Sequence, residues 1–143
     1  MIVAMILGEK GRAVVTIGAK ATIGEAVSEL AKHKIGAIVV VEDSDRIVGI
    51  ISERDVVRAV AKSGMDVLSE SVGSIMTSEV MTCSDPETID EVMSRMTLGR
   101  FRHLPVEKQG RLTGIISIGD VVKARIEEVE REAEEMRAYI ATA

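Results

Sequence analysis

The sequence predicts an α/β (α+β) fold made of two copies of one β-α-β-β-α unit and a C-terminal helix. Residues 14–40 match residues 80–106 at an offset of 66, with seven of 27 positions identical. Residues 46–59 match residues 111–124 at an offset of 65, with nine of 14 positions identical. Self-similarity on this scale indicates a duplicated supersecondary unit. A third observation, an apolar seam in the last 22 residues, predicts the helix that follows the second copy.

Both copies carry the same order of elements. A strand leads to a helix that opens with a capping box, Thr22 with Glu25 in the first copy and Thr88 with Glu91 in the second. A hairpin of two strands follows, and a second helix begins at a serine, Ser52 or Ser117. The predicted strands cover residues 14–17, 37–41 and 46–51 in the first copy and residues 80–83, 103–106 and 111–116 in the second.

Two half-domains of this size would each leave one face of a sheet open. We therefore expect the copies to pack together with pseudo-twofold symmetry and to leave two similar clefts between them. The predicted organisation is a first repeat at 8–65, a linker at 66–75, a second repeat at 76–125 and an acidic amphipathic helix at 126–143.

Composition excludes several classes of function. A net charge of −5 and an aromatic content of 1% argue against nucleic-acid binding, which needs basic faces or stacking rings. Cys83 is the sole cysteine, which fits a reducing compartment, and no apolar run reaches the length of a membrane span. We expect a cytoplasmic protein without membrane contact. No catalytic constellation or phosphate-cradling glycine loop occurs, so we expect no enzymatic activity.

The segments GIISERD at 49–55 and GIISIGD at 114–120, together with FRHLPV at 101–106, resemble a tandem pair of cystathionine β-synthase (CBS) domains. The resemblance implies a stand-alone CBS pair, or Bateman module, that binds AMP, ADP, ATP, NAD(H) or S-adenosylmethionine in its clefts without a metal. It also implies a homodimer that senses cellular energy or redox state and regulates a partner protein, whose identity the sequence does not give. The alternative is an interaction scaffold that keeps the fold and binds no ligand.

The repeated Ser-x-x-Asp motif has two interpretations. Ser52 with Asp55, and Ser117 with Asp120, have the spacing of a helix N-cap and its third residue, where a carboxylate is favourable by itself. The resemblance implies that each aspartate also accepts hydrogen bonds from a ribose diol. A carboxylate has about four lone-pair directions, so both roles are compatible.

Cationic side chains distinguish the second copy. Arg100, Arg102 and His103 stand immediately before Leu104 and Pro105, and charge-assisted donors of this kind suit a phosphate. The resemblance implies that this segment, including Pro105, belongs to the ligand site. The alternative is that the two arginines are solvated charges at a strand end and that the histidine caps a chain end.

The first copy supplies different candidates. Ile35, Gly36 and Ala37 are small or apolar, and the resemblance implies that they line the adenine site of the other copy. Arg54 lies in the Ser52–Asp55 motif and reaches either a phosphate or a neighbouring acid. The weaker candidates are Thr77, Met81 and Phe101.

The tail carries apolar residues at a spacing of 4-3-4-3-4, with glutamates on the other faces. An isolated helix of this length is marginal in water, so the seam is expected to dock on its own body or on a partner's helix. We favour packing in a dimer, and a frayed, solvated end is the alternative. The seam residues are Val122, Ile126, Val129, Ala133, Met136 and Ile140.

Overall fold

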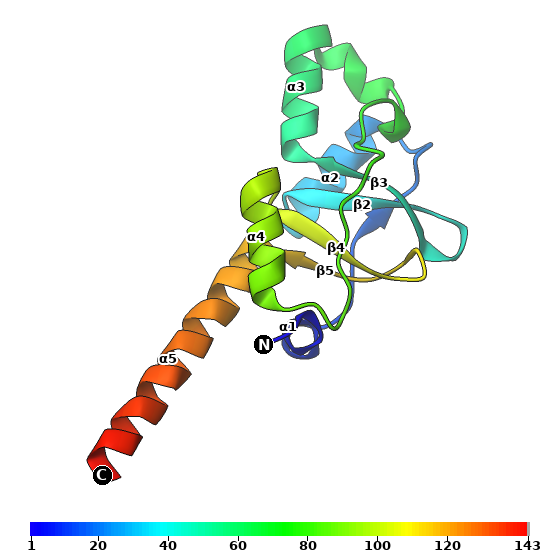
Figure 1. The fold of residues 1–143 in the computed structure, drawn as a ribbon. Coiled ribbons are helices and arrows are strands. Elements are labelled where there is room, and N and C mark those ends of the chain that lie inside the picture. Colours follow the sequence, from blue (N-terminus) through cyan, green and yellow to red (C-terminus); the bar gives the residue numbers. More distant parts are fainter. Residues whose placement is uncertain (143) are drawn as a thin grey trace. The chain divides into compact units, whose positions relative to one another are not determined.

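The computed structural model describes residues 1–142 as two compact units, and each unit is described here by itself (Figure 1). Unit 1 combines Met1–Arg12 with Cys83–Val106 and the chain from Gly114 onward. Unit 2 combines Ala13–Thr82 with Glu107–Thr113, the tip of the second copy's hairpin. Helices and strands occur together in the mixed α+β class that the sequence predicts, and the C-terminal helix is present.

Unit 2 has the predicted order of elements. Thr22 caps the first helix through its side chain, which accepts a hydrogen bond from the Glu25 amide at 3.1 Å, and the Glu25 carboxylate bonds back to the Thr22 amide. The apolar face of this helix and the central strands form one core, in which Ile23, Ile38 and Ile51 are fully buried. The elements are β1 Thr16–Ile17, α2 Ile23–His33, β2 Ala37–Glu42, β3 Arg46–Ser52 and α3 Glu53–Ser63.

Strand β2 lies at the centre of the unit 2 sheet. It pairs in parallel with β1 and antiparallel with β3, as the hairpin prediction requires. Arg46 of β3 also pairs with Arg111, in the hairpin tip that belongs to the same unit.

Unit 1 repeats this order with one difference. Its elements are α1 Val3–Lys10, α4 Ile89–Gly99, β4 His103–Lys108, β5 Arg111–Ser117 and α5 Ile118–Thr142. The strand predicted at 80–83 is wrong over most of its length, because only the bridge from Cys83 to Val106 forms. Pro105 stands opposite this segment, at the position of Val39 in unit 2, and cannot donate a ladder hydrogen bond because it lacks an N–H. In unit 2 the strand predicted at 14–17 forms at Thr16–Ile17.

Helix α1 was not predicted, and it completes unit 1. The Val3 amide donates to the Glu87 carbonyl at 2.9 Å, and the Ile89 amide donates to the Met1 carbonyl at 3.1 Å. These bonds fix α1 against the start of α4, and they bury Val3, Ile6 and Leu7 in the unit 1 core.

In unit 2 the segment that follows α3 is hydrogen-bonded to the start of α2, as α1 is to the start of α4 in unit 1. The Val72 amide donates to Ala21 at 2.8 Å, and the Ile23 amide donates to Glu70 at 2.9 Å. This segment was predicted as a plain linker, but it forms two 3-10 turns and buries Val67 and Val72. Each unit therefore contains one copy together with the stretch of chain that precedes the other copy.

Close backbone approach explains a glycine shared by both copies. A Cβ atom on Gly49 would lie 2.5 Å from the sulfur of Met76 and 3.0 Å from the Thr77 carbonyl oxygen. On Gly114 it would lie 2.9 Å from each of two Leu7 methyl groups. The same tight packing thus recurs in each unit.

We expect Gly49→Ala to lower the free energy of unfolding by about 1–3 kcal/mol, because overpacking forces the neighbouring backbone to move. Gly114→Ala should cost less, since its Cβ atom meets the ends of one side chain, Leu7, and no backbone atom. Urea denaturation measures both effects. Gly18→Ala is the control, because a Cβ atom there meets nothing within 4 Å. Equal stability of the Gly18 and Gly49 variants would contradict the packing account.

No helix of residues 1–142 combines the length and the hydropathy that are needed to cross a bilayer.

Candidate functional site

Asp120 lies in the first turn of α5, in unit 1. Its Oδ2 atom accepts a hydrogen bond from the Ser117 amide at 2.8 Å, and its own amide donates to the Ser117 hydroxyl at 3.1 Å. This reciprocal pair is the capping arrangement that the motif predicts. The capping role of Ser117 and Asp120 is therefore present, and the ribose role stays a prediction.

A lysine that the sequence analysis missed also contacts this carboxylate. The Lys10 ammonium donates to Asp120 Oδ2 at 2.7 Å and to the Ile115 carbonyl at 3.0 Å. Lys10 ends α1, 110 positions away in the chain and outside the repeated segments, so no local pattern pointed to it. The site in unit 1 is thus a carboxylate and an ammonium group in direct contact.

The surroundings of Asp120 lower its pKa below the ordinary value. Burial alone raises the pKa, but the hydrogen bonds from Lys10 and Ser117 and the charge of Lys10 outweigh it. The carboxylate therefore stays ionised to a lower pH than an ordinary aspartate does. The bonds from the Lys10 ammonium and from the Ser117 amide both end on Oδ2.

The predicted phosphate-binding side chains begin at Arg100, three residues before β4. The Arg102 carbonyl accepts a hydrogen bond from the Ile118 amide at 2.8 Å, which fixes the Arg102 backbone beside the first turn of α5. The Arg102 side chain is exposed, His103 is half-buried at the start of β4, and Arg100 ends α4 in a left-handed conformation with φ of 54°. Pro105 is buried, and its carbonyl accepts from the Cys83 amide. The structure therefore brings the backbone of Arg102 to the helix end that holds Asp120.

Unit 2 contains the same backbone arrangement without the cations. Asp55 Oδ2 accepts from the Ser52 amide at 2.8 Å and from the Ser52 hydroxyl at 3.0 Å. The Gly36 carbonyl accepts from the Glu53 amide at 3.0 Å, as Arg102 does from Ile118. Arg54 is exposed on the first turn of α3. Among the described residues the Asp55 carboxylate bonds only to Ser52, so no equivalent of Lys10 is present.

The other candidates divide between the units. Ile35 and Gly36 are half-buried and Ala37 is buried; all three belong to unit 2, and their role beside the other copy's ligand stays a prediction. Thr77 also lies in unit 2, where it exchanges two backbone hydrogen bonds with Ile50, at 2.9 and 3.0 Å. In unit 1, Phe101 packs partly buried against the core.

The chemistry available in unit 1 is recognition of a polar anion. An ionised carboxylate accepts hydrogen bonds from hydroxyl groups, and neighbouring cations favour a negatively charged group. Over residues 1–142 no group of three or more His, Cys, Asp or Glu side chains has an arrangement that holds a metal ion.

Comparison with known proteins agrees with the duplicated fold. The model of the CBS domain matches twice, at residues 11–62 and 72–127. The chain is similar to the crystal structure of the CBS-domain containing protein ATU1752 from Agrobacterium tumefaciens, with 53% identity and a TM-score of 0.84. That match covers 87% of this chain and 99% of the other.

Two further relatives extend the comparison. The CBS domain protein PAE2072 from Pyrobaculum aerophilum, solved in complex with AMP, is 31% identical with a TM-score of 0.75, over 84% of this chain and 89% of that one. The mitochondrial CBS domain-containing protein CBSX3 of Arabidopsis thaliana is 38% identical over 83% of this chain. The chain spans 60% of the plant protein's length. With two matches to the family model over most of its length, this chain belongs to the CBS domain family.

Proposed function

We propose that the protein is a regulatory module that binds an adenosine nucleotide, with AMP as the reference ligand, at the Asp120 site of unit 1. The observation that carries the proposal is the ionised Asp120 carboxylate at the start of α5, whose Oδ2 atom accepts from Lys10 and from the Ser117 amide. The AMP complex of the relative PAE2072 supports the choice of ligand class.

In this proposal Asp120 accepts the ribose diol, and Arg102 and His103, with Arg100, bind the phosphate. An arginine offers a planar fork of donors that matches a phosphate group. The Ser117 hydroxyl holds the aspartate in place. The same roles at lower affinity are proposed for Asp55, Ser52 and Arg54 in unit 2.

Regulation would follow from differential affinity. A ligand shifts an equilibrium between two arrangements only by the difference in its affinity for them. We propose that nucleotide binding favours one arrangement of the module, that a partner protein reads this arrangement, and that the module itself catalyses nothing. We also propose that the module works as a homodimer.

Isothermal titration calorimetry with AMP, ADP, ATP, NADH and S-adenosylmethionine tests the proposal. We expect the phosphorylated ligands to bind without turnover. S-adenosylmethionine carries a positive charge beside its ribose and should bind most weakly next to Lys10 and Arg102. Product formation would identify an enzyme instead. The absence of a binding signal with all five ligands would identify a scaffold that binds none of them.

Lys10 has an expected role in charge selection. The Lys10→Met substitution removes the positive charge and leaves the negative charge of the Asp120 carboxylate uncompensated beside an anionic ligand. We expect AMP binding to weaken about 3- to 10-fold, the scale of the attraction between two opposite charges in water without a direct bond, while binding of uncharged adenosine changes little. Calorimetry of both ligands measures the difference.

Lys20→Met is the matched control, because Lys20 is an exposed lysine of unit 2. It should leave the affinity for both ligands unchanged. An equal loss of AMP binding in the Lys10 and Lys20 variants would show that only the overall charge of the chain matters.

A further inference from the structure

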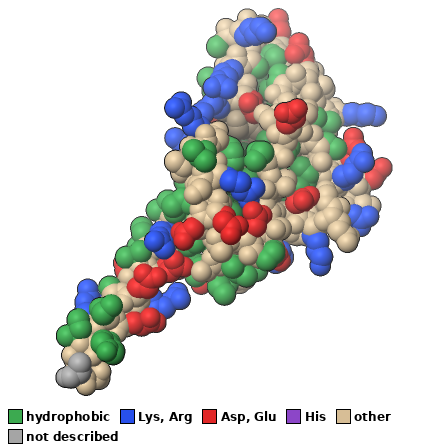
Figure 2. Space-filling view, viewed as in Figure 1, with side chains coloured by type: hydrophobic (Ala, Val, Ile, Leu, Met, Phe, Trp, Pro, Cys, Tyr) green, Lys and Arg blue, Asp and Glu red, His purple; other side chains and the backbone are tan. Residues whose placement is uncertain are grey.

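The apolar seam of α5 lies open to solvent. Helix α5 extends beyond the rest of unit 1 as a single rod (Figure 1). Its large seam side chains are 43% to 66% exposed, so the seam does not dock on its own body. Figure 2 shows hydrophobic side chains along this rod, interspersed with acidic and basic ones. These exposed residues are Val122, Ile126, Val129, Met136 and Ile140.

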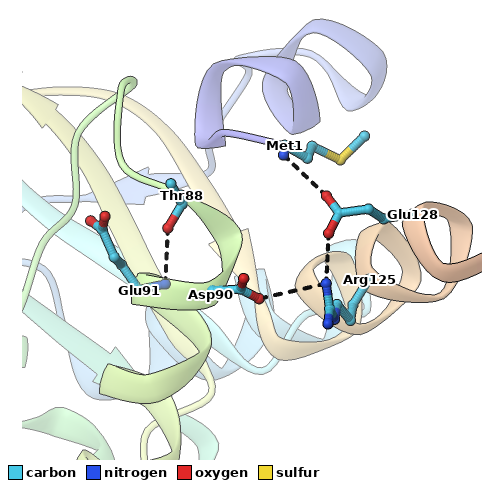
Figure 3. Close-up of polar contacts among 6 residues, drawn as sticks. All are labelled: Met1, Thr88, Asp90, Glu91, Arg125 and Glu128. Atoms are coloured by element: carbon cyan, nitrogen blue, oxygen red, sulfur yellow. Dashed lines mark hydrogen bonds and ion pairs between the residues drawn. The ribbon is translucent and has the colours of Figure 1, made fainter. Parts of the chain in front are cut away.

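Contacts at the base of α5 determine which face stays open. Arg125 bonds to Glu128 at 2.6 Å and lies 3.9 Å from Asp90 of α4 (Figure 3). Glu128 also pairs with the amino group of Met1 at 3.0 Å. Val121 and Ala124 are buried against the body. These contacts hold one face of the first turns against unit 1, so the seam on another face projects away from it.

We propose that the α5 seam pairs with the same seam of a second copy as a parallel two-stranded coiled coil. The heptad places Ile126, Ala133 and Ile140 at a positions and Val122, Val129 and Met136 at d positions. The flanking e and g positions then decide the direction in which the two helices run.

The charges at these flanking positions are complementary in a parallel pair of helices and not in an antiparallel pair. In a parallel pair each g residue faces the e residue five positions further along the partner. Glu132 then faces Arg137 of the second copy. This pair is of opposite charge, and twofold symmetry makes it occur twice. Arg125, at the preceding g position, binds Glu128 of its own helix instead.

The antiparallel alternative brings like charges together. With the seams fully overlapped, e residues face e residues and g residues face g residues. Lys123 then faces Arg137, Glu130 faces its own counterpart, and Glu132 faces its own counterpart. Like charges across an interface suppress that pairing. Charge complementarity therefore selects the parallel arrangement of two identical helices.

A charge swap in the full chain tests the pairing. Glu132→Arg places two arginines opposite each other, and we expect the dimer dissociation constant from analytical ultracentrifugation to rise about tenfold. The double variant Glu132→Arg/Arg137→Glu reverses the pair and should restore the wild-type constant. Glu134→Arg makes the same charge change on the outer face of the helix and should leave the constant unchanged.

Cross-linking tests the direction. In the parallel coil Met136 faces Met136 of the second copy, so Met136→Cys should form a disulfide-linked dimer under mild oxidation. The native Cys83 does not compete, because burial raises the pKa of its thiol to about 12. A wild-type monomer, an unrestored double variant, or a Met136→Cys chain that does not cross-link would each overturn the proposal. Titration of the same variants with AMP measures binding at the Asp120 site, so the two proposals are tested separately.

Discussion

Asp120→Ala is expected to weaken AMP binding at the stronger site by about 100-fold. The substitution removes the carboxylate that receives the ribose diol, and hydrogen bonds to a charged group contribute about 1.5–3 kcal/mol each. Calorimetry of AMP against the variant measures the loss. The same change removes a helix cap, which costs about 1 kcal/mol of stability, so the fold is retained.

Asp55→Ala is the matched control for this prediction. Asp55 accepts from Ser52 at the same 2.8 Å at which Asp120 accepts from Ser117, so both variants lose an equivalent cap. We expect the Asp55 variant to keep the stronger AMP site. If the two variants bind AMP alike, Asp120 is a capping residue only.

The lowered pKa of Asp120 sets the pH range of this behaviour. Burial raises the pKa, but Lys10 and Ser117 lower it by more, so the folded-state pKa lies below the ordinary value of about 3.9. The stabilisation from this carboxylate is present above the ordinary pKa and disappears only as the pH falls through the lower folded-state value. Asp120 should therefore not limit AMP binding between pH 8 and pH 5.

Arg102→Ala is expected to weaken AMP binding about 10- to 100-fold while adenosine binding stays nearly constant. The lost partner is the phosphate, which adenosine lacks, and a charge-assisted bond from an arginine to phosphate has this magnitude. Titration of both ligands against the variant separates a phosphate contact from a general loss of structure.

Arg131→Ala removes the same charge from an exposed position of α5 and serves as the control. Its affinity for both ligands should match the wild type. An equal loss of adenosine and AMP binding in the Arg102 variant would mean that Arg102 is needed for the local structure rather than for the phosphate.

The repeated parts of the fold were predictable because their signals are local. The capping box of Thr22 and Glu25, and the spacing of Ser117 and Asp120, involve residues three positions apart. The hairpin of β2 and β3 depends on adjacent segments. Such signals can be recognised in a single sequence without knowledge of the tertiary structure.

The parts that were missed depend on long-range packing. Helix α1 is held by backbone bonds to Glu87 and Asp85, and Lys10 reaches Asp120 across 110 positions. The strand predicted at 80–83 failed because Pro105 on the opposite strand removes a donor, an effect that apolar patterning does not register. The Asp120 carboxylate was predictable from its motif, but its ammonium partner was not.

The most direct measurement compares AMP with 2′,3′-dideoxy-AMP by calorimetry, on the wild type and on Asp120→Ala. If the carboxylate receives the diol, the wild type binds AMP about 100-fold more tightly than the dideoxy analogue, and the variant binds both equally weakly. Equal affinity of the wild type for the two ligands would contradict the account.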